Sequence, residues 1–470
     1  NETTLLEPKK HIKQQPQDSL LYIKPSTSCS TSKKNISDLE TSNNNTESFE
    51  SKSLGSFNPT LDQEKKLDSC LLQTAKKVFV NSSLYQLLEQ KAPNNTHNNH
   101  LSIEKIEGGL SNDLFKISFN SELFFLKLFG KHSMSFLLDR EFEEEVMSRM
   151  NAVNQSSIVT ESDKVTYRIE EFISEYRPIT KDEISLELNG EFLDKIINVI
   201  IKVNSTIEYG KGTFKYGKEK DSMEILRKLL NMAENHIKNS LESEKTLISN
   251  KQFSKICLTQ IEEDYKQINS ILNKIRKVYL GTDDFIQLSA DQQLKKEDGT
   301  VVSSDSSIPL VLSHNDIHCG NILIKDKDNL DIKVIDFEYA NFNYIGFDIV
   351  NYFVECCIDL SSESYPFFHV KRPFESLFRD ELYIQVYRKY VDRISGIMNL
   401  TEKVIQYIKT KEYYYKLLSL ASSYWSLVAI NTIEPENDLT KETFNYREYS
   451  LERLKVFELY LLYANSKIES

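Results

Sequence analysis

The sequence predicts an α+β fold in which a small lobe built on an antiparallel sheet precedes a large, mainly helical lobe. Apolar runs at 101–107, 114–119 and 123–129 are short and are separated by turn-forming residues, which is typical of an antiparallel meander. After residue 173, apolar residues recur mostly at helical spacing, apart from one predicted hairpin within 310–337. This change of period divides the chain into two lobes.

The predicted N-lobe covers 61–173 and the predicted C-lobe covers 174–470. Residues 1–60 contain 24 Ser, Thr or Asn and only three aromatic residues, too little apolar surface to offset the entropy of ordering. We expect a disordered tail there. The remaining N-lobe elements are predicted as one or two entry helices within 61–91, a helix at 137–150 and a strand pair within 158–173.

A charged region at 211–310 interrupts the C-lobe. Apolar residues between Ile261 and Tyr279 alternate four and three apart, which suits either a coiled-coil seam or a helix packed on its own lobe. The run is short, and coiled coils usually sustain three or four heptads, so the second interpretation is favoured. Residues 282–307 are rich in charged residues and serine and are predicted to form a flexible, solvated insertion.

Length and charge exclude several classes of function. The 470 residues suit either about three average domains or one large two-lobed unit. Lys plus Arg is 58 and Asp plus Glu is 70, a net charge of −12, which argues against non-specific binding to nucleic acid or an anionic membrane. We find no transmembrane segment, secretory leader or paired cysteine motif, and therefore expect a cytoplasmic protein with reduced thiols.

Two segments of the C-lobe carry residues suited to chemistry. Antiparallel pairing of strands at 321–324 and 332–336 would bring Asn321 close to Asp336. An amide oxygen and a carboxylate at one point are hard oxygen ligands of the kind that Mg²⁺ prefers, together with water and substrate phosphates. We therefore predict that Asn321 and Asp336 bind a magnesium ion.

Asp316 precedes this predicted metal site by five residues. A carboxylate there can accept the proton of an acceptor hydroxyl group and orient that group towards the γ-phosphate of ATP. The order Asp316, Asn321, Asp336 is the catalytic arrangement of kinases. His-Asn-Asp and Asp-Phe-Glu replace the His-Arg-Asp and Asp-Phe-Gly of protein kinases, and no Ala-Pro-Glu follows, which favours a small-molecule kinase.

The N-lobe supplies matching candidates for ATP binding. Lys127 lies on the third predicted strand, where kinases place the lysine that contacts the α- and β-phosphates and a helix glutamate. The loop between the first two strands occupies the place of a phosphate-covering loop, and the inter-lobe strand offers backbone groups to adenine. The candidate contacts in these two segments are Gly108, Gly109, Ser111 and Asn112, and Glu171, Phe172 and Ile173.

From about residue 100 onward, the sequence resembles the choline/ethanolamine kinase family. The motifs that carry the resemblance are Gly-Gly-Leu-Ser-Asn at 108–112, His-Asn-Asp-Ile-His-Cys-Gly-Asn at 314–321 and Ile-Asp-Phe-Glu-Tyr at 335–339. The resemblance implies a protein-kinase-like two-lobed fold, ATP and Mg²⁺ as cofactors, and an amino alcohol as acceptor. It places an Arg-x-x-Glu motif on Arg140 and Glu143, and thereby selects Glu143 as the partner of Lys127.

The resemblance also implies an acceptor site for choline. A quaternary ammonium cannot donate hydrogen bonds, so aromatic faces and a carboxylate are the groups that hold it. Matching positions are Tyr339, Glu355, Phe367, Trp425, Phe444 and Tyr449, together with the catalytic Asp316. Asp348 is expected to brace the catalytic loop. Phosphorylation of choline would be the first step of phosphatidylcholine synthesis by the CDP-choline route.

Two positions depart from the family pattern, and they leave the acceptor open. Ser422 replaces a tryptophan, and Leu360 stands near the place of an aromatic residue, whereas the Tyr-Pro-Phe-Phe segment at 365–368 favours choline. The alternatives are an ethanolamine kinase, more distantly an aminoglycoside or sugar-alcohol phosphotransferase, and a pseudokinase acting as a binding module. Homodimerisation is implied by the resemblance alone.

Overall fold

A computed structural model describes residues 61–91, 100–106, 112–130, 135–180, 183, 190–206, 222–250, 255–281, 285–286, 308–325, 331–360, 362–435, 439 and 443–466. The predictions for the tail at 1–60 and for Gly108, Gly109 and Ser111 lie outside these residues. Among the helices that the structure describes, none is both long enough and apolar enough to cross a bilayer.

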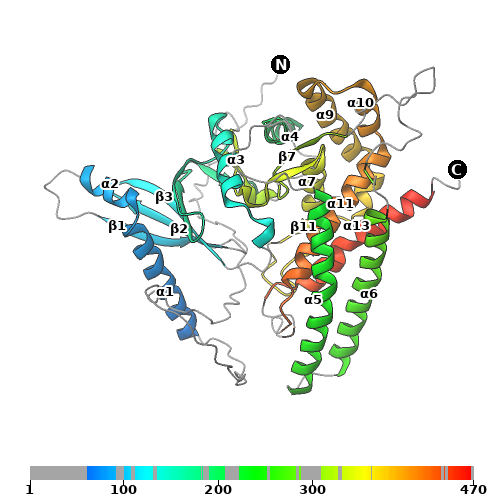
Figure 1. The fold of residues 1–470 in the computed structure, drawn as a ribbon, viewed down its shortest axis with the longest axis horizontal. Coiled ribbons are helices and arrows are strands. Elements are labelled where there is room, and N and C mark those ends of the chain that lie inside the picture. The colour runs from blue at the N-terminus through cyan, green and yellow to red at the C-terminus, as the bar shows by residue number, and fades with distance from the viewer. Residues whose placement is uncertain are drawn as a thin grey trace, which may run out of the picture.

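The N-lobe contains a five-stranded antiparallel sheet with strand order β1-β2-β3-β5-β4 (Figure 1). The predicted meander is confirmed, because β2 pairs with both β1 and β3. The predicted entry helices, the helix after the meander and the strand pair are also present. The elements are α1 (Leu61–Val80), α2 (Ser83–Lys91), β1 (Leu101–Ile106), β2 (Asn112–Phe119), β3 (Glu122–Phe129), α3 (Arg140–Ala152), β4 (Val159–Ser162) and β5 (Tyr167–Glu171).

The sheet is covered by α1 on one face. Alternate residues of β2 and β3 point to that face because side chains along a strand alternate between its two sides. Phe79 of α1 packs on Phe119 and Phe124, with ring centroids 6.5 and 6.1 Å apart. These residues belong to a small hydrophobic core that is separate from the core of the C-lobe. The helix α3 packs on the C-lobe core through Phe142 and Val146, and so bridges the two parts.

The C-lobe is mainly helical, as predicted. Its helices are α4 (Gly190–Ser205), α5 (Ser222–Asn250), α6 (Lys255–Leu280), α7 (Phe347–Cys356), α8 (Glu375–Arg379), α9 (Glu381–Met398), α10 (Glu402–Ile408), α11 (Lys411–Thr432) and α13 (Tyr446–Ser466). Its strands are β6 (Tyr176–Pro178), β7 (Leu310–Ser313), β8 (Ile322–Lys325), β9 (Ile332–Val334), β10 (Asn341–Tyr344), β11 (Ile358–Asp359) and β12 (His369–Val370).

The predicted hairpin is confirmed in β8 and β9, where Ile322 lies opposite Val334. The sequence did not reveal that β7 pairs with β10, or that β6 adds a third strand to the hairpin. These additional strands are only three or four residues long, so they carry too little periodicity to be recognised. They hold the segments before Asp316 and after Asp336 in fixed positions.

The helices α5 and α6 form an antiparallel pair that projects from the C-lobe (Figure 1). The apolar residues at alternating spacing on α6, from Ile261 to Tyr279, are buried in the C-lobe core, which confirms packing on its own lobe. The predicted insertion differs in one respect. Phe285 and Ile286 are buried, because Phe285 packs on Tyr279 with a ring-centroid distance of 4.5 Å. Residues 282–284 and 287–307 lie outside the described part of the chain.

Candidate active site

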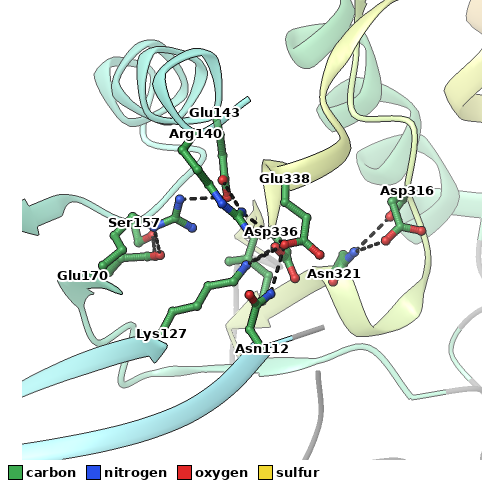
Figure 2. Close-up of polar contacts among 12 residues, drawn as sticks. Asn112, Lys127, Arg140, Glu143, Ser157, Glu170, Asp316, Asn321, Asp336 and Glu338 are labelled. Atoms are coloured by element: carbon green, nitrogen blue, oxygen red, sulfur yellow. Dashed lines mark hydrogen bonds and ion pairs between the residues drawn. The ribbon is translucent and has the colours of Figure 1, made fainter. Parts of the chain in front are cut away.

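The loop from β7 to β8 brings Asp316 and Asn321 together. A short 3-10 turn at Cys319–Asn321 directs Asn321 back towards the start of the loop. Its Nδ2 donates to the backbone oxygen of Asp316 at 3.0 Å and to Asp316 Oδ2 at 3.3 Å. The backbone oxygen of Asn321 accepts from the nitrogen of Ile335 at 3.0 Å, which places Asp336 next to the same point (Figure 2). The structure therefore brings together the three predicted catalytic residues.

Asp348, at the start of α7, holds this loop in shape. Its carboxylate accepts hydrogen bonds from the backbone nitrogens of His314 and Asn315, each at 2.9 Å, and from Asn204 Nδ2 at 2.8 Å. Asn315 adopts a left-handed conformation with φ 66°, and asparagine tolerates this better than most residues. Burial raises the pKa of Asp348, although its hydrogen bonds and His314 act in the opposite direction. The predicted bracing role of Asp348 is confirmed.

His318 was not identified from the sequence, although it lies two residues after Asp316. Its Nδ1 accepts from the backbone nitrogen of Gly320 at 3.0 Å, and its Nε2 lies 3.6 Å from Asp316 Oδ2. Burial alone would lower the pKa of His318, but the Asp316 carboxylate outweighs this and raises the pKa well above its ordinary value. His318 and Asn321 thus both approach Oδ2 of the Asp316 carboxylate.

Lys127 reaches across from the N-lobe to the end of β9. Its Nζ donates to Asp336 Oδ1 at 2.7 Å and to Glu338 Oε2 at 3.3 Å, as Figure 2 shows. The side chain of Lys127 is 3% exposed, whereas that of Asp336 is 34% exposed and open to a ligand. Burial alone would lower the pKa of Lys127, but the carboxylates of Asp336, Glu338 and Glu143 outweigh it and raise the pKa, so the ammonium stays charged.

Glu338 is the central residue of this cluster, and sequence reasoning did not single it out. Its Oε2 accepts from Lys127 Nζ, from Asn112 Nδ2 at 3.0 Å and from Arg140 Nη1 at 3.3 Å. It follows Asp336, whose left-handed backbone at φ 64° begins a short 3-10 turn at 337–339. Its partners Asn112, Lys127 and Arg140 are distant from it in the sequence, so no local pattern indicates this role.

The expected pairing of Lys127 with Glu143 is not what the structure shows. Glu143 Oε2 lies 2.8 Å from Arg140 Nη1, and its Oε1 lies 2.8 Å from Arg168 Nη1. Burial raises the pKa of Glu143, but these two arginines and Lys127 more than reverse the effect. Arg168 lies opposite Lys127 in the β3–β5 pair, and it forms an ion pair with Glu143 where Lys127 does not. Glu143 therefore acts on Lys127 only through its charge.

The predicted adenine contacts are partly occupied by the protein itself. The backbone nitrogen of Glu171 donates to the oxygen of Ile158 at 2.9 Å, and that of Phe172 donates to the oxygen of Leu123 at 3.3 Å. Among the described residues, no acceptor engages the backbone nitrogen of Ile173. Of the three predicted positions, Ile173 thus keeps an N–H group for a ligand.

The donor set fits a nucleotide phosphate with a hard divalent cation. Asn321 uses its amide nitrogen on Asp316, and no described residue donates to its Oδ1, which leaves that oxygen for a cation beside the partly exposed Asp336. Mg²⁺ takes few protein ligands of this kind and completes its shell with water and phosphate oxygens. Lys127 supplies a fixed positive charge next to it.

An aromatic wall follows the catalytic loop. Tyr339 and Trp425 are in edge contact, with ring centroids 5.2 Å apart, and Trp425 Nε1 donates to the backbone oxygen of Asn315 at 3.0 Å. A second group joins Phe444 to Tyr449, whose centroids lie 5.2 Å apart. The predicted Phe367 has a left-handed backbone at φ 66° and lies 6.5 Å from the ring of Tyr365. Its neighbour Phe368 makes the contacts with both Phe444 and Tyr449, at 5.6 and 5.3 Å.

Glu355 is the carboxylate beside this second group. It lies near the end of α7 with 10% of its side chain exposed and forms an ion pair with Arg453 of α13. Arg453 Nη1 also donates to the Tyr449 hydroxyl at 2.9 Å. Ser422, at the position that departs from the family pattern, donates to the backbone oxygen of Arg453 at 2.7 Å. A serine at this position therefore lets α11 approach the backbone of α13.

Comparisons with known proteins agree with the geometry. A family model described as choline/ethanolamine kinase matches residues 103–458. Choline kinase alpha of Mus musculus is 30% identical over 164 residues, which is 32% of this chain and 33% of that relative. Ethanolamine kinase 1 of Mus musculus is 30% identical over 152 residues, 31% of this chain and 39% of that relative. The alignments with the curated relatives span only 12% to 39% of their lengths.

A solved structure of choline kinase from Cryptosporidium parvum shares the fold. It has 20% sequence identity and a TM-score of 0.52, and the superposition covers 82% of this chain and 96% of that one. The predicted two-lobed, kinase-like fold, with a small antiparallel sheet and a mainly helical second lobe, is therefore confirmed.

Proposed function

This chain belongs to the choline/ethanolamine kinase family, and from that premise we propose that it transfers the γ-phosphoryl group of ATP to the hydroxyl group of choline, giving phosphocholine and ADP. The observation that carries the proposal is the convergence of Asp316, Asn321 and Asp336 at the end of the β8–β9 hairpin, opposite Lys127. The relatives include kinases of both choline and ethanolamine, so the phosphotransfer step rests on this geometry and the acceptor rests on the aromatic wall.

Each catalytic residue has a defined task in this proposal. Asp316 accepts the hydroxyl proton of choline as the choline oxygen bonds to the γ-phosphorus, and the electron pair of the broken P–O bond leaves with ADP. Asn321 and Asp336 would hold Mg²⁺, which would offset the charge on the transferring group. Lys127 holds the α- and β-phosphates, and Asp348 keeps the backbone before Asp316 in the required conformation.

The acceptor assignment follows from the chemistry of the pocket. Tyr339, Trp425, Phe444 and Tyr449 offer aromatic rings near the catalytic loop, and such rings attract a quaternary ammonium through cation–π interactions. We place the reaction in the cytoplasm as the first step of phosphatidylcholine synthesis. Homodimerisation stays a prediction from the family resemblance.

Ethanolamine is the second candidate acceptor, and a specific observation favours it. Ser422 removes an aromatic ring that the family pattern has at that position, which reduces the area available for cation–π contact. A kinetic panel with choline, dimethylethanolamine, monomethylethanolamine and ethanolamine distinguishes the two. The proposal expects kcat/KM to rise with the number of methyl groups. A far higher kcat/KM for ethanolamine than for choline would exclude choline as the principal acceptor.

A further inference from the structure

Arg453 is the most unusual charged residue outside the ATP-binding cluster. It lies on α13, and its side chain is 0% exposed. A single nitrogen, Nη1, makes both of its described polar contacts, with the Glu355 carboxylate and with the Tyr449 hydroxyl at 2.9 Å. Glu355, the carboxylate proposed to attract the cationic acceptor, is thus already paired with the guanidinium group of Arg453.

The other side-chain nitrogens of Arg453 are buried away from any described acceptor. Neither Nε nor Nη2 has an acceptor among the residues that the structure describes. Buried donors left in this way destabilise the folded state, and a buried ion pair is rarely more favourable than apolar residues of similar size. Such an arrangement calls for a functional reason. The contact with a carboxylate and a tyrosine of the acceptor pocket indicates where that reason lies.

Taking choline phosphorylation as the function, we propose that Arg453 is a specificity-determining residue that favours a quaternary ammonium over a primary one. A primary ammonium has N–H groups that each need an acceptor once water is removed. A trimethylammonium group has none and is held by aromatic faces. Arg453 occupies Glu355 Oε1 and the Tyr449 hydroxyl, two polar acceptors of this part of the pocket.

Arg453 acts here as a positioning residue as well. Its Cζ lies 5.5 Å from the centroid of the Tyr449 ring, and its bond to the Tyr449 hydroxyl holds the ring beside Phe444. The same contact therefore withdraws two acceptors from ethanolamine and presents an ordered aromatic face to choline. Both effects raise the ratio of kcat/KM for choline to kcat/KM for ethanolamine.

The test compares this ratio in the full-length wild type, Arg453→Gln and Arg453→Lys. Arg453→Gln removes the positive charge and leaves the Glu355 carboxylate available to the acceptor. We therefore expect the ratio to fall by about tenfold, mainly through a lower KM for ethanolamine. Arg453→Lys keeps the charge, but its shorter side chain presents the cation in a different position, so we expect a smaller fall in the same direction. Protection of each variant by ADP in a thermal shift assay confirms that it is folded.

Arg447→Gln is the matched control. Arg447 lies on the same helix, is also buried, and pairs with Glu244 of α5 at 2.9 and 3.0 Å. The ratio should not change in this variant. Equal changes in the Arg447 and Arg453 variants, or an unchanged ratio in a folded Arg453 variant, would overturn the inference. A wild type that phosphorylates none of the amino alcohols would instead overturn the proposed function.

Discussion

The side-chain amide of Asn321 donates to both the backbone oxygen and the carboxylate of Asp316, at 3.0 and 3.3 Å. This contact fixes the distance between the proposed base and the proposed metal ligand before any substrate binds. It also uses the amide nitrogen, so the amide oxygen must face the other way. A preorganised arrangement of this kind avoids reorganisation during phosphotransfer.

Asp316→Asn is expected to lower kcat by about 10²–10⁴-fold, because an amide cannot accept the hydroxyl proton. Binding of ADP should be retained, since Asp316 makes no contact with Lys127 or Glu338 in the cluster that we propose holds the phosphates. Steady-state kinetics and ADP titration measure the two effects separately. Asp194→Asn serves as a control, because Asp194 forms surface ion pairs with Lys389 and Arg393. Unchanged function in Asp316→Asn would support the pseudokinase alternative.

Glu338→Gln should weaken both stability and ATP binding. The carboxylate is 4% exposed and accepts from Lys127, Arg140 and Asn112, so an amide leaves two buried cations with a weaker partner. We expect a loss of about 1.5–3 kcal/mol in the free energy of unfolding. KM for ATP should rise more than KM for choline, because Lys127 loses one of its two carboxylate partners.

Urea denaturation and kinetics with each substrate varied in turn measure the effects of Glu338→Gln. Glu381→Gln is the comparison, because Glu381 forms exposed ion pairs with Arg388 and Lys411, and such pairs contribute little to stability. Equal losses of stability in the two variants would contradict the central role of Glu338.

The proximity of Asn321 and Asp336 was predictable from the sequence because one hairpin positions both residues. Strand pairing converts the positions of Asn321 and Asp336 into proximity, and pairing needs only two apolar runs and a turn. The partner of Lys127 was not predictable in the same way. Arg168 and Arg140 compete for Glu143, and the left-handed turn at Asp336 brings Glu338 towards Lys127.

Only the residue types of the proposed acceptor pocket were predictable from the sequence. Glu355 of α7 and Arg453 of α13 are 98 residues apart in the sequence, and no local pattern indicates their contact. Likewise, the burial of Phe285 depends on Tyr279 and on Tyr460 of α13, whose ring lies 5.8 Å away. Tertiary packing, rather than periodicity, decides both.

Asp348→Asn is expected to disturb the catalytic loop without affecting the nucleotide site. The carboxylate accepts from the backbone nitrogens of His314 and Asn315 and from Asn204 Nδ2, and an amide nitrogen in its place would face at least one of these donors. We expect a fall in kcat together with a loss of about 2–5 kcal/mol of stability. Kinetics on the folded fraction measure kcat, and urea denaturation measures the loss of stability. KM for ATP should stay close to that of the wild type. A selective rise in KM for ATP would argue against bracing.

Gly346→Ala tests the start of α7, which carries Asp348. Gly346 has φ 94°, and an added Cβ would lie 3.0 Å from both Leu417 Cδ1 and Tyr387 Cε2. The unfavourable backbone conformation and the crowding together predict a loss of about 2–4 kcal/mol in the free energy of unfolding.

Gly396→Ala provides the opposite case within α9, because an added Cβ meets nothing within 4 Å there. Since alanine favours helix over glycine by about 1 kcal/mol, this variant should be as stable as the wild type or more so. Urea denaturation of the two variants should therefore shift in opposite directions, and a stable Gly346→Ala protein would show that the entry to α7 can relax without moving the catalytic loop.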